Sequence, residues 1–152
     1  MLKKRKGHIE RIHLTIDRVG TEISQNDEKR VIEAFTTHFP LRKPLPWLTN
    51  VRHADTYEEG LGIDIIFETD VGPVYLQIKG SDFGHTQFCN RQKRGEVSVE
   101  IICVVINPAM DHAKIVQKLL GQLSGERKAR KNKSLEQSLF PTQQTTTKTD
   151  PL

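Results

Sequence analysis

The sequence predicts an α/β protein: a single domain with a central mixed β-sheet flanked by helices. Three observations support this class. A helical apolar pattern precedes a group of strand-length apolar runs, a second helical pattern follows the last run, and turn residues separate the runs. Such an order is typical of one sheet covered by helices. The length of 152 residues suits one domain with its own core and hardly leaves room for two.

The first predicted helix covers residues 26–39. Ser24 or Asn26 can cap it, and its first turn is acidic, which suits the helix dipole. One apolar stripe runs along it, made of Val31, Ile32, Phe35 and Phe39. Residues 1–25 form an N-terminal extension with a basic start. Their apolar residues fit both the helical and the strand period, so the structure of this extension is left open.

A β-hairpin over residues 62–80 is the most informative local pattern. Two apolar runs of strand length flank a set of turn residues, and a further strand is predicted before them over residues 48–53. Strand alternation places Asp64 on one face of the first run. It places Gln77 and Lys79 together on one face of the second run.

The register of this hairpin decides which side chains meet. A turn centred near Asp70 and Val71 puts Asp64 opposite Gln77, with Lys79 as a diagonal neighbour. A register one residue longer pairs Asp64 with Lys79 directly. In either register such cross-strand neighbours lie roughly 5 to 8 Å apart, which is close enough to share one ion and one water.

Three further elements are predicted after the hairpin. Residues 81–94 read as a loop leading into a short helix, and residues 97–106 as a buried strand that Asn-Pro stops. A second amphipathic helix is predicted over residues 111–123, with Asp111 as its cap and Gly125 closing it.

The composition changes at residue 126 to Lys, Arg, Ser, Gln and Thr. This predicts a disordered basic and polar tail over residues 126–152, and leaves residues 26–125 as the folded core. The net charge of +4 lies at the two ends, and residues 7–125 carry about −3. Charge therefore does not make the folded part a nucleic-acid-binding module, although basic ends can contact phosphates.

The chain has no apolar run near the roughly 20 residues of a membrane span, and its start does not resemble a secretory signal. Cys89 and Cys103 are far apart and are not a disulfide framework. We therefore expect a soluble, intracellular and cytoplasmic protein of prokaryotic or phage type.

The hairpin and its context resemble the PD-(D/E)XK nuclease superfamily, in the variant where Gln replaces the second acid. The matching residues are Gly62-Ile63-Asp64 and Gln77-Ile78-Lys79-Gly80, preceded by an acid-bearing helix and followed by a helix and a strand. The resemblance covers residues 26–123. It implies a restriction-endonuclease-like core and a Mg²⁺- or Mn²⁺-dependent endonuclease that hydrolyses DNA phosphodiester bonds.

The resemblance also implies roles for individual residues. Asp64, the Gln77 side-chain carbonyl and the Ile78 backbone carbonyl would be metal ligands, and Lys79 would orient the attacking water. The chemistry of these groups agrees, because hard divalent cations prefer oxygen ligands and an ammonium group stabilises developing negative charge. The plain alternative is a cross-strand salt bridge between Asp64 and Lys79.

Because Gln77 is neutral, the site is one carboxylate short. Glu28 lies on the apolar stripe of the first helix, where an acid is costly without a partner, so we expect it to complete both the catalytic and the metal-binding set. Glu58 or Glu59 could compensate instead. A role for Glu28 in the helix dipole is the simpler alternative.

Four residues that closely follow the hairpin are predicted to contact nucleic-acid phosphates: His85, Arg91, Lys93 and Arg94. Surface solvation explains these side chains equally well. Two other functions stay open. One is a catalytically decayed nuclease fold that binds nucleic acid or recruits a partner, and the other is a small interaction protein whose tail does the recruiting.

The predicted partner is DNA, without a membrane. A homodimer is left open, because cutting both strands commonly needs two sites. The segment from Glu136 to Phe140 resembles the short peptide by which bacterial replication and repair enzymes bind the sliding clamp, with Glu in the place of the leading Gln. A stray apolar pair explains the same segment.

Overall fold

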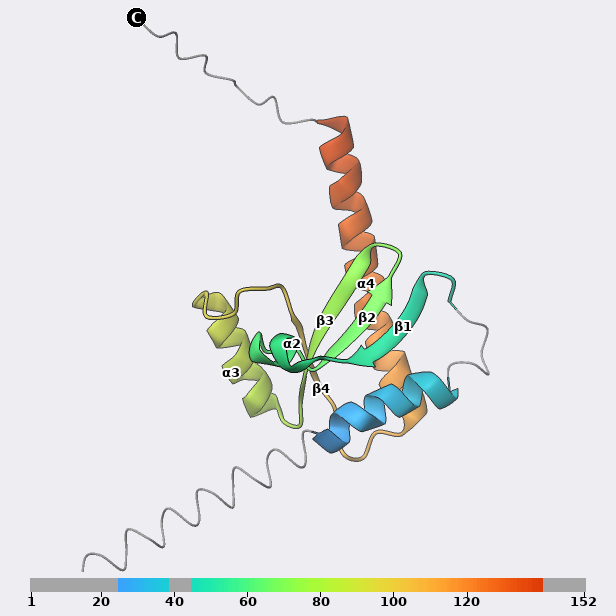
Figure 1. Ribbon diagram of the computed structural model, residues 1–152, viewed down its shortest axis with the longest axis vertical. Helices are drawn as coiled ribbons and strands as arrows, with labels where there is room; N and C mark the ends of the chain where they lie inside the picture. Colours follow the sequence, from blue (N-terminus) through green and yellow to red (C-terminus); the bar gives the residue numbers. More distant parts are fainter. Residues whose placement is uncertain (1–24, 39–44, 141–152) are drawn as a thin grey trace, which may run out of the picture.

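The computed structural model describes residues 25–38 and 45–140, and within them the strands form one four-stranded sheet in the order β1-β2-β3-β4 (Figure 1). The strands are β1 (Leu48–His53), β2 (Ile65–Thr69), β3 (Gly72–Lys79) and β4 (Ile102–Val105). The first three pair antiparallel, and β4 pairs parallel to β3. The predicted class, a mixed sheet flanked by helices, is confirmed for these residues.

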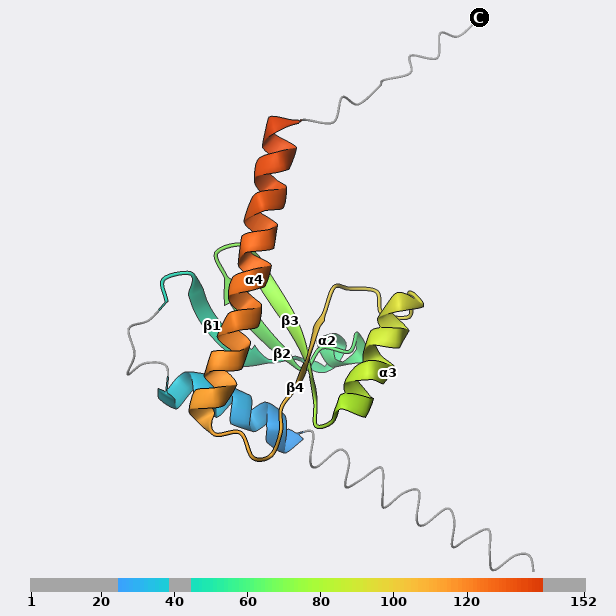
Figure 2. The same cartoon turned by 180° about the vertical axis from the view of Figure 1, so that it is seen from behind.

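Helices cover both faces of this sheet (Figures 1 and 2). On one face lie a helix over residues 25–33, which continues as the π-helical turn η1 (Ala34–His38), and the long helix α4 (His112–Leu139). The other face carries α3 (Asp82–Lys93), which connects the parallel strands β3 and β4. The short helix α2 (Thr56–Gly60) connects β1 to β2.

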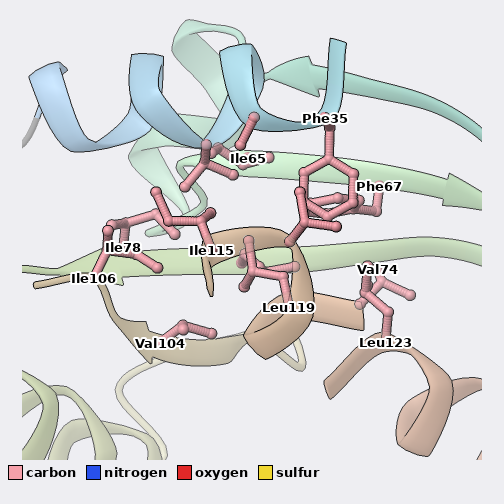
Figure 3. Packing of buried hydrophobic residues seen from close by; sticks show 14 residues of the cluster. Phe35, Ile65, Phe67, Val74, Ile78, Val104, Ile106, Ile115, Leu119 and Leu123 are labelled. Atoms are coloured by element: carbon pink, nitrogen blue, oxygen red, sulfur yellow. The ribbon is translucent and has the colours of Figure 1, made fainter. Parts of the chain in front are cut away.

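The larger core lies between the sheet and the two helices that cover one of its faces, the first helix and α4 (Figure 3). Phe35 packs edge to face against Phe67, with ring centroids 4.9 Å apart. Strand alternation sends Ile65 and Phe67 into this core and Ile66 into a smaller core beneath α3. Burial of these apolar side chains is the main contribution to the stability of the fold, and it fixes the hairpin strands between the two cores.

The β2–β3 register is the shorter of the two that the sequence allowed. Thr69 pairs with Gly72, so Asp70 and Val71 form the turn as predicted. Ile65 pairs with Leu76, and the same register continued by one residue puts Asp64 opposite Gln77. Direct pairing of Asp64 with Lys79 is excluded.

The region before β4 differs from the prediction at both of its ends. The helix α3 begins directly after Ser81, whose hydroxyl accepts a hydrogen bond from the Gly84 N–H, so hardly any loop precedes it. Strand β4 is shorter than the predicted range 97–106. The Ile101 carbonyl accepts a 2.7 Å hydrogen bond from the Gln92 side chain, and the strand ladder begins only at the next residue.

The helix α4 is the largest departure from the sequence prediction. It begins at the predicted cap Asp111 but continues past Gly125 to Leu139, so the predicted tail over 126–152 is wrong for its helical part. The core boundary predicted at residue 125 therefore falls inside a helix. Residues 1–24, 39–44 and 141–152, which include the rest of the predicted tail and nearly all of the extension, lie outside the described residues.

Contacts with the β2–β3 turn explain why the helix continues. Arg127 forms two hydrogen bonds with the Asp70 carboxylate, at 2.8 and 2.6 Å, and lies over the Trp47 ring at 5.4 Å from its centroid. Arg130 donates to the Pro73 carbonyl at 2.9 Å and pairs with Glu126 one turn earlier. These partners are far away in the sequence, so composition alone could not reveal them.

Candidate active site

Asp64 immediately precedes β2, and its backbone is held from both sides. Its N–H donates to the Leu76 carbonyl at 2.8 Å, and its carbonyl accepts from the Ala54 N–H at 2.9 Å. Its side-chain Oδ2 accepts two hydrogen bonds of 2.7 Å, from Gln77 Nε2 and from the Ile78 N–H. The carboxylate is therefore fixed against β3 in both position and orientation.

Gln77 is nine-tenths buried, with 8% of its surface exposed. Its Nε2 is used by Asp64, whereas its Oε1 makes no hydrogen bond to any of the described residues. A Cβ added to Gly62 would lie 3.7 Å from this oxygen and 3.6 Å from the Phe88 ring. The unpaired amide oxygen of Gln77 therefore lies next to the bare backbone of Gly62.

Lys79 follows Gln77 on the same face of β3. Its Nζ lies 5.9 Å from the centroid of the Phe88 ring, and its aliphatic chain passes within 3.4 Å of where a Gly84 Cβ would be. Within the described part of the chain, Lys79 and Asp64 form no salt bridge; the close partners of Asp64 are Gln77 and Ile78. The plain ion pair that the sequence left open is not formed.

The pKa of Asp64 is raised to about 6, mainly because burial disfavours the charged carboxylate. The Ile78 N–H, the Lys79 charge and the Gln77 amide act in the opposite direction, and the negative charge of Glu59 raises this pKa further. Burial likewise raises the pKa of Cys103, which is the β4 neighbour of Gln77, to about 11. A cation near Asp64 would favour its ionised form.

Glu28 and Glu58, two of the acids considered for the missing carboxylate, have other partners. Glu58 accepts hydrogen bonds of 2.7 and 3.0 Å from Arg52 and closes a capping box with Asp55. These bonds lower its pKa to about 2. The Glu28 carboxylate lies 3.8 Å from His53 Nδ1 at the end of β1. Its role in the site stays a prediction.

The third acid, Glu59, is exposed and lines a groove of about 240 Å³. Gly62 and Phe88, which contact the Gln77 and Lys79 side chains, line the same groove. Glu59 is therefore the acid of the three that lines a groove together with Gly62, and Arg91 lines the same groove.

Sequence reasoning missed a buried acid on the first helix. Asp27 is 3% exposed; its Oδ1 accepts from Arg30 at 3.1 Å, and its Oδ2 has no partner among the described residues. A Cβ on Gly80 would lie 3.6 Å from Oδ2, so this acid lies beside the end of β3. The available signal was its spacing of four residues before the fully buried Val31, which places it on the core-facing stripe.

The predicted phosphate-binding residues lie together on α3 and its C-cap: His85, Arg91, Lys93 and Arg94. Both arginines form salt bridges with Glu96, at 3.5 and 3.1 Å, which offsets part of their charge. The His85 ring lies 3.7 Å from Cys89 Sγ. The clamp-like segment lies at the end of α4, where Leu139 and Phe140 are 71% and 79% exposed.

In residues 25–38 and 45–140, no three His, Cys, Asp or Glu side chains gather closely enough to hold a metal ion. A cation at Asp64 would therefore need amide and backbone oxygens as well as carboxylates. None of the helices in the described part is long and apolar enough to span a bilayer. In comparisons with known proteins, no family model, no curated protein and no solved structure matches this chain.

Proposed function

We propose that this protein is a metal-dependent nuclease that hydrolyses DNA phosphodiester bonds at Asp64, Gln77 and Lys79. The observation that supports it most directly is the Asp64 carboxylate, which is held rigidly against β3 beside an unpaired amide oxygen and a lysine on the same face. The order of elements, a helix, three antiparallel strands, a helix and a parallel fourth strand, fits a restriction-endonuclease-like core.

The ligand set fits a hard divalent cation. Asp64, the Gln77 Oε1 and the Ile78 carbonyl would hold Mg²⁺ or Mn²⁺, which binds oxygen ligands and keeps several waters. When bound, the cation would neutralise charge on the phosphate. The two hydrogen bonds to Asp64 Oδ2 leave Oδ1 as the available carboxylate oxygen. Fixed ligands of this kind need little reorganisation when substrate arrives.

Lys79 would contact either the attacking water or the phosphate. Its stem passes beside Gly84, and its Nζ lies 5.9 Å from the centroid of the Phe88 ring. From there it would donate hydrogen bonds to the attacking water or to a phosphate oxygen, and so stabilise the charge that develops as the phosphorus–oxygen bond breaks.

DNA cleavage tests the proposal. Purified protein with Mg²⁺ or Mn²⁺ should cut plasmid, linear or branched DNA, and Lys79→Ala should abolish cutting while the unfolding temperature shows a folded domain. Lys128→Ala, an exposed lysine on α4, is the matched control and should cut like the wild type. Equal cutting by wild type and Lys79→Ala would refute the site.

The alternative is a catalytically decayed nuclease fold that binds nucleic acid or recruits a partner. The observation favouring it is the neutral Gln77 in the position of an acid, which should weaken cation binding. Calorimetry with Mn²⁺ separates the two functions. Binding that is lost in Asp64→Ala supports the nuclease, and wild-type protein that binds no Mn²⁺ supports the decayed fold.

A further inference from the structure

We propose that the outer edge of β4 is an interface between two copies of this chain. The two β4 strands would pair antiparallel about a two-fold axis at Cys103, and the two four-stranded sheets would become one continuous sheet. This interface goes beyond the proposed function and does not depend on it.

The strand β4 has the composition of an interior strand, yet it is an edge strand of the sheet that the described residues form. Residues 101–105 are all apolar, without a charge or a proline. Edge strands are commonly protected from pairing by charges, prolines or bulges. The opposite edge strand, β1, has an irregular register between Leu48 and Asn50 and carries Arg52. The edge of β4 has no such protection and is suited to pairing with a further strand.

The backbone groups of β4 point alternately toward β3 and away from it. The Ile106 N–H donates to the Lys79 carbonyl at 2.9 Å, so this residue faces β3. Because the direction alternates along a strand, Cys103 and Val105 direct their N–H and carbonyl groups to the outer edge. In the part of the chain that the structure describes, the outward groups of Cys103 have no hydrogen-bond partner.

Side chains occupy the outer edge on both sides of Cys103. The Ile101 carbonyl accepts a 2.7 Å hydrogen bond from Gln92 on α3, and the Val105 carbonyl accepts one of 2.7 Å from Lys118 on α4. Both carbonyls are two residues from Cys103, so the open stretch is symmetric about it. In antiparallel pairing centred there, Cys103 exchanges two hydrogen bonds with the partner's Cys103. The Val105 N–H then donates to the second lone pair of the partner's Ile101 carbonyl.

A groove of about 470 Å³ lies beside this edge, between β4 and α4. It is lined by Ile102, Lys118, Gly121, Gln122, Gly125 and Glu126. A Cβ added to Gly121 or Gly125 would meet no atom within 4 Å. The helix therefore leaves room for another chain beside the open edge.

The charges that line the groove are self-complementary. Lys118 lies at the end of β4, and α4 runs from there back toward the start of the strand, because Arg127 contacts the turn that precedes β3. Glu126 therefore lines the other end of the groove. A two-fold axis at Cys103 reverses the direction of β4 and brings Lys118 of each copy toward the partner's Glu126. This complementarity favours a second copy over an unrelated strand.

The pairing would also bring two of the proposed nuclease sites together. Cys103 is the β4 neighbour of Gln77. Three strand spacings of about 4.8 Å, or about 14 Å, would then separate Gln77 from the partner's Gln77, on the same face of the joined sheet. Cleavage of both DNA strands needs two such sites. This consequence rests on the proposed function, whereas the interface does not.

Sedimentation equilibrium of the full chain tests the interface. We expect the wild type to be a dimer, and Gly121→Arg and Gly125→Arg to be monomers, because each fills the groove with a long side chain. Arginine favours a helix more than glycine does, so α4 is retained in both variants. Ala129→Arg adds the same charge at an exposed position on α4 outside the groove and should remain a dimer.

Oxidative cross-linking tests the register. Directly opposite residues in a hydrogen-bonded antiparallel pair have Cα atoms about 5.5 Å apart, which is within the range of a disulfide. In Cys89→Ala the only cysteine left is Cys103. Oxidation of this variant by copper phenanthroline should give a covalent dimer. Cys103→Ser, which keeps Cys89, should give none.

Each other outcome overturns part of the proposal. A wild type that stays monomeric at the highest concentration it tolerates in solution refutes the interface, and so do Gly121→Arg and Gly125→Arg variants that both remain dimers. A dimer in which Cys103 forms no disulfide refutes the register centred on this residue. The nuclease proposal stands in all of these cases, because cleavage by wild type and Lys79→Ala tests it separately.

Discussion

The Gln77 amide donates a 2.7 Å hydrogen bond to Asp64 Oδ2, and the neighbouring Ile78 N–H donates to the same oxygen at the same distance. Both donors belong to β3, so the carboxylate is oriented by a strand rather than by a flexible loop. Sites built on strands hold their geometry more accurately than sites on loops. The same arrangement buries a charge, and this has measurable consequences.

Asp64→Asn should stabilise the fold at neutral pH. The folded-state pKa of about 6 exceeds the usual 3.8, so the folded state binds the proton more tightly than the unfolded state does. In the wild type, protonated Asp64 therefore contributes its full stabilisation of the folded state below about pH 4, and this contribution is lost as the pH rises through 6. Urea unfolding should show Asp64→Asn more stable than wild type by roughly 1 to 3 kcal/mol at pH 7.5. A gap of equal size at pH 4 and pH 7.5 would contradict this origin.

Gly62→Ala should weaken metal binding more than it weakens the fold. Gly62 and Gly95 both have positive φ, of 90° and 73°, so an alanine at either position is strained by about 1 kcal/mol. Around Gly95 nothing lies within 4 Å of the new methyl group, whereas at Gly62 the methyl group would lie against Gln77 Oε1. We expect similar losses of stability in the two variants, and weaker Mn²⁺ binding in Gly62→Ala alone. Equal Mn²⁺ affinities would mean that this oxygen is not a ligand.

Arg127→Ala should loosen the second half of α4. This side chain joins the helix to the β2–β3 turn through Asp70 and to the Trp47 ring, while the adjacent Lys128 is exposed. We expect a lower unfolding temperature and faster amide hydrogen exchange over residues 126–139 in Arg127→Ala. Lys128→Ala is the matched control and should leave both unchanged. Unchanged exchange in Arg127→Ala would show that α4 persists without this contact.

Arg30→Ala should be strongly destabilising. Arg30 pairs with the buried Asp27 and donates to the carbonyls of Asn107, Pro108 and Met110, which connects the first helix to the loop after β4. Its removal leaves a buried carboxylate without a partner, at a cost of about 3 kcal/mol. Lys29→Ala removes an exposed pairing with Glu33 and should change the free energy of unfolding little. Similar effects of the two changes would refute this role.

The acids of the first helix show how far sequence reasoning reached and where it stopped. The apolar residues predicted the helix correctly, and Val31 and Phe35 are both in the larger core. The buried face of this helix nevertheless contains Asp27, Val31, Ala34 and Phe35 and not Glu28, so the packed face differs from the one inferred. A helical period read from four apolar residues does not define the face that accurately.

The sequence by itself determined the α/β class, the hairpin and the shared face of Gln77 and Lys79. These features depend on local physics, because strand alternation has a period of two and turn residues restrict the backbone within a few positions. Only the tertiary structure decided the length of α4 and which acids are already paired. Those outcomes depend on contacts such as Arg127 with Asp70, whose partners are 57 residues apart and meet only when the chain is folded.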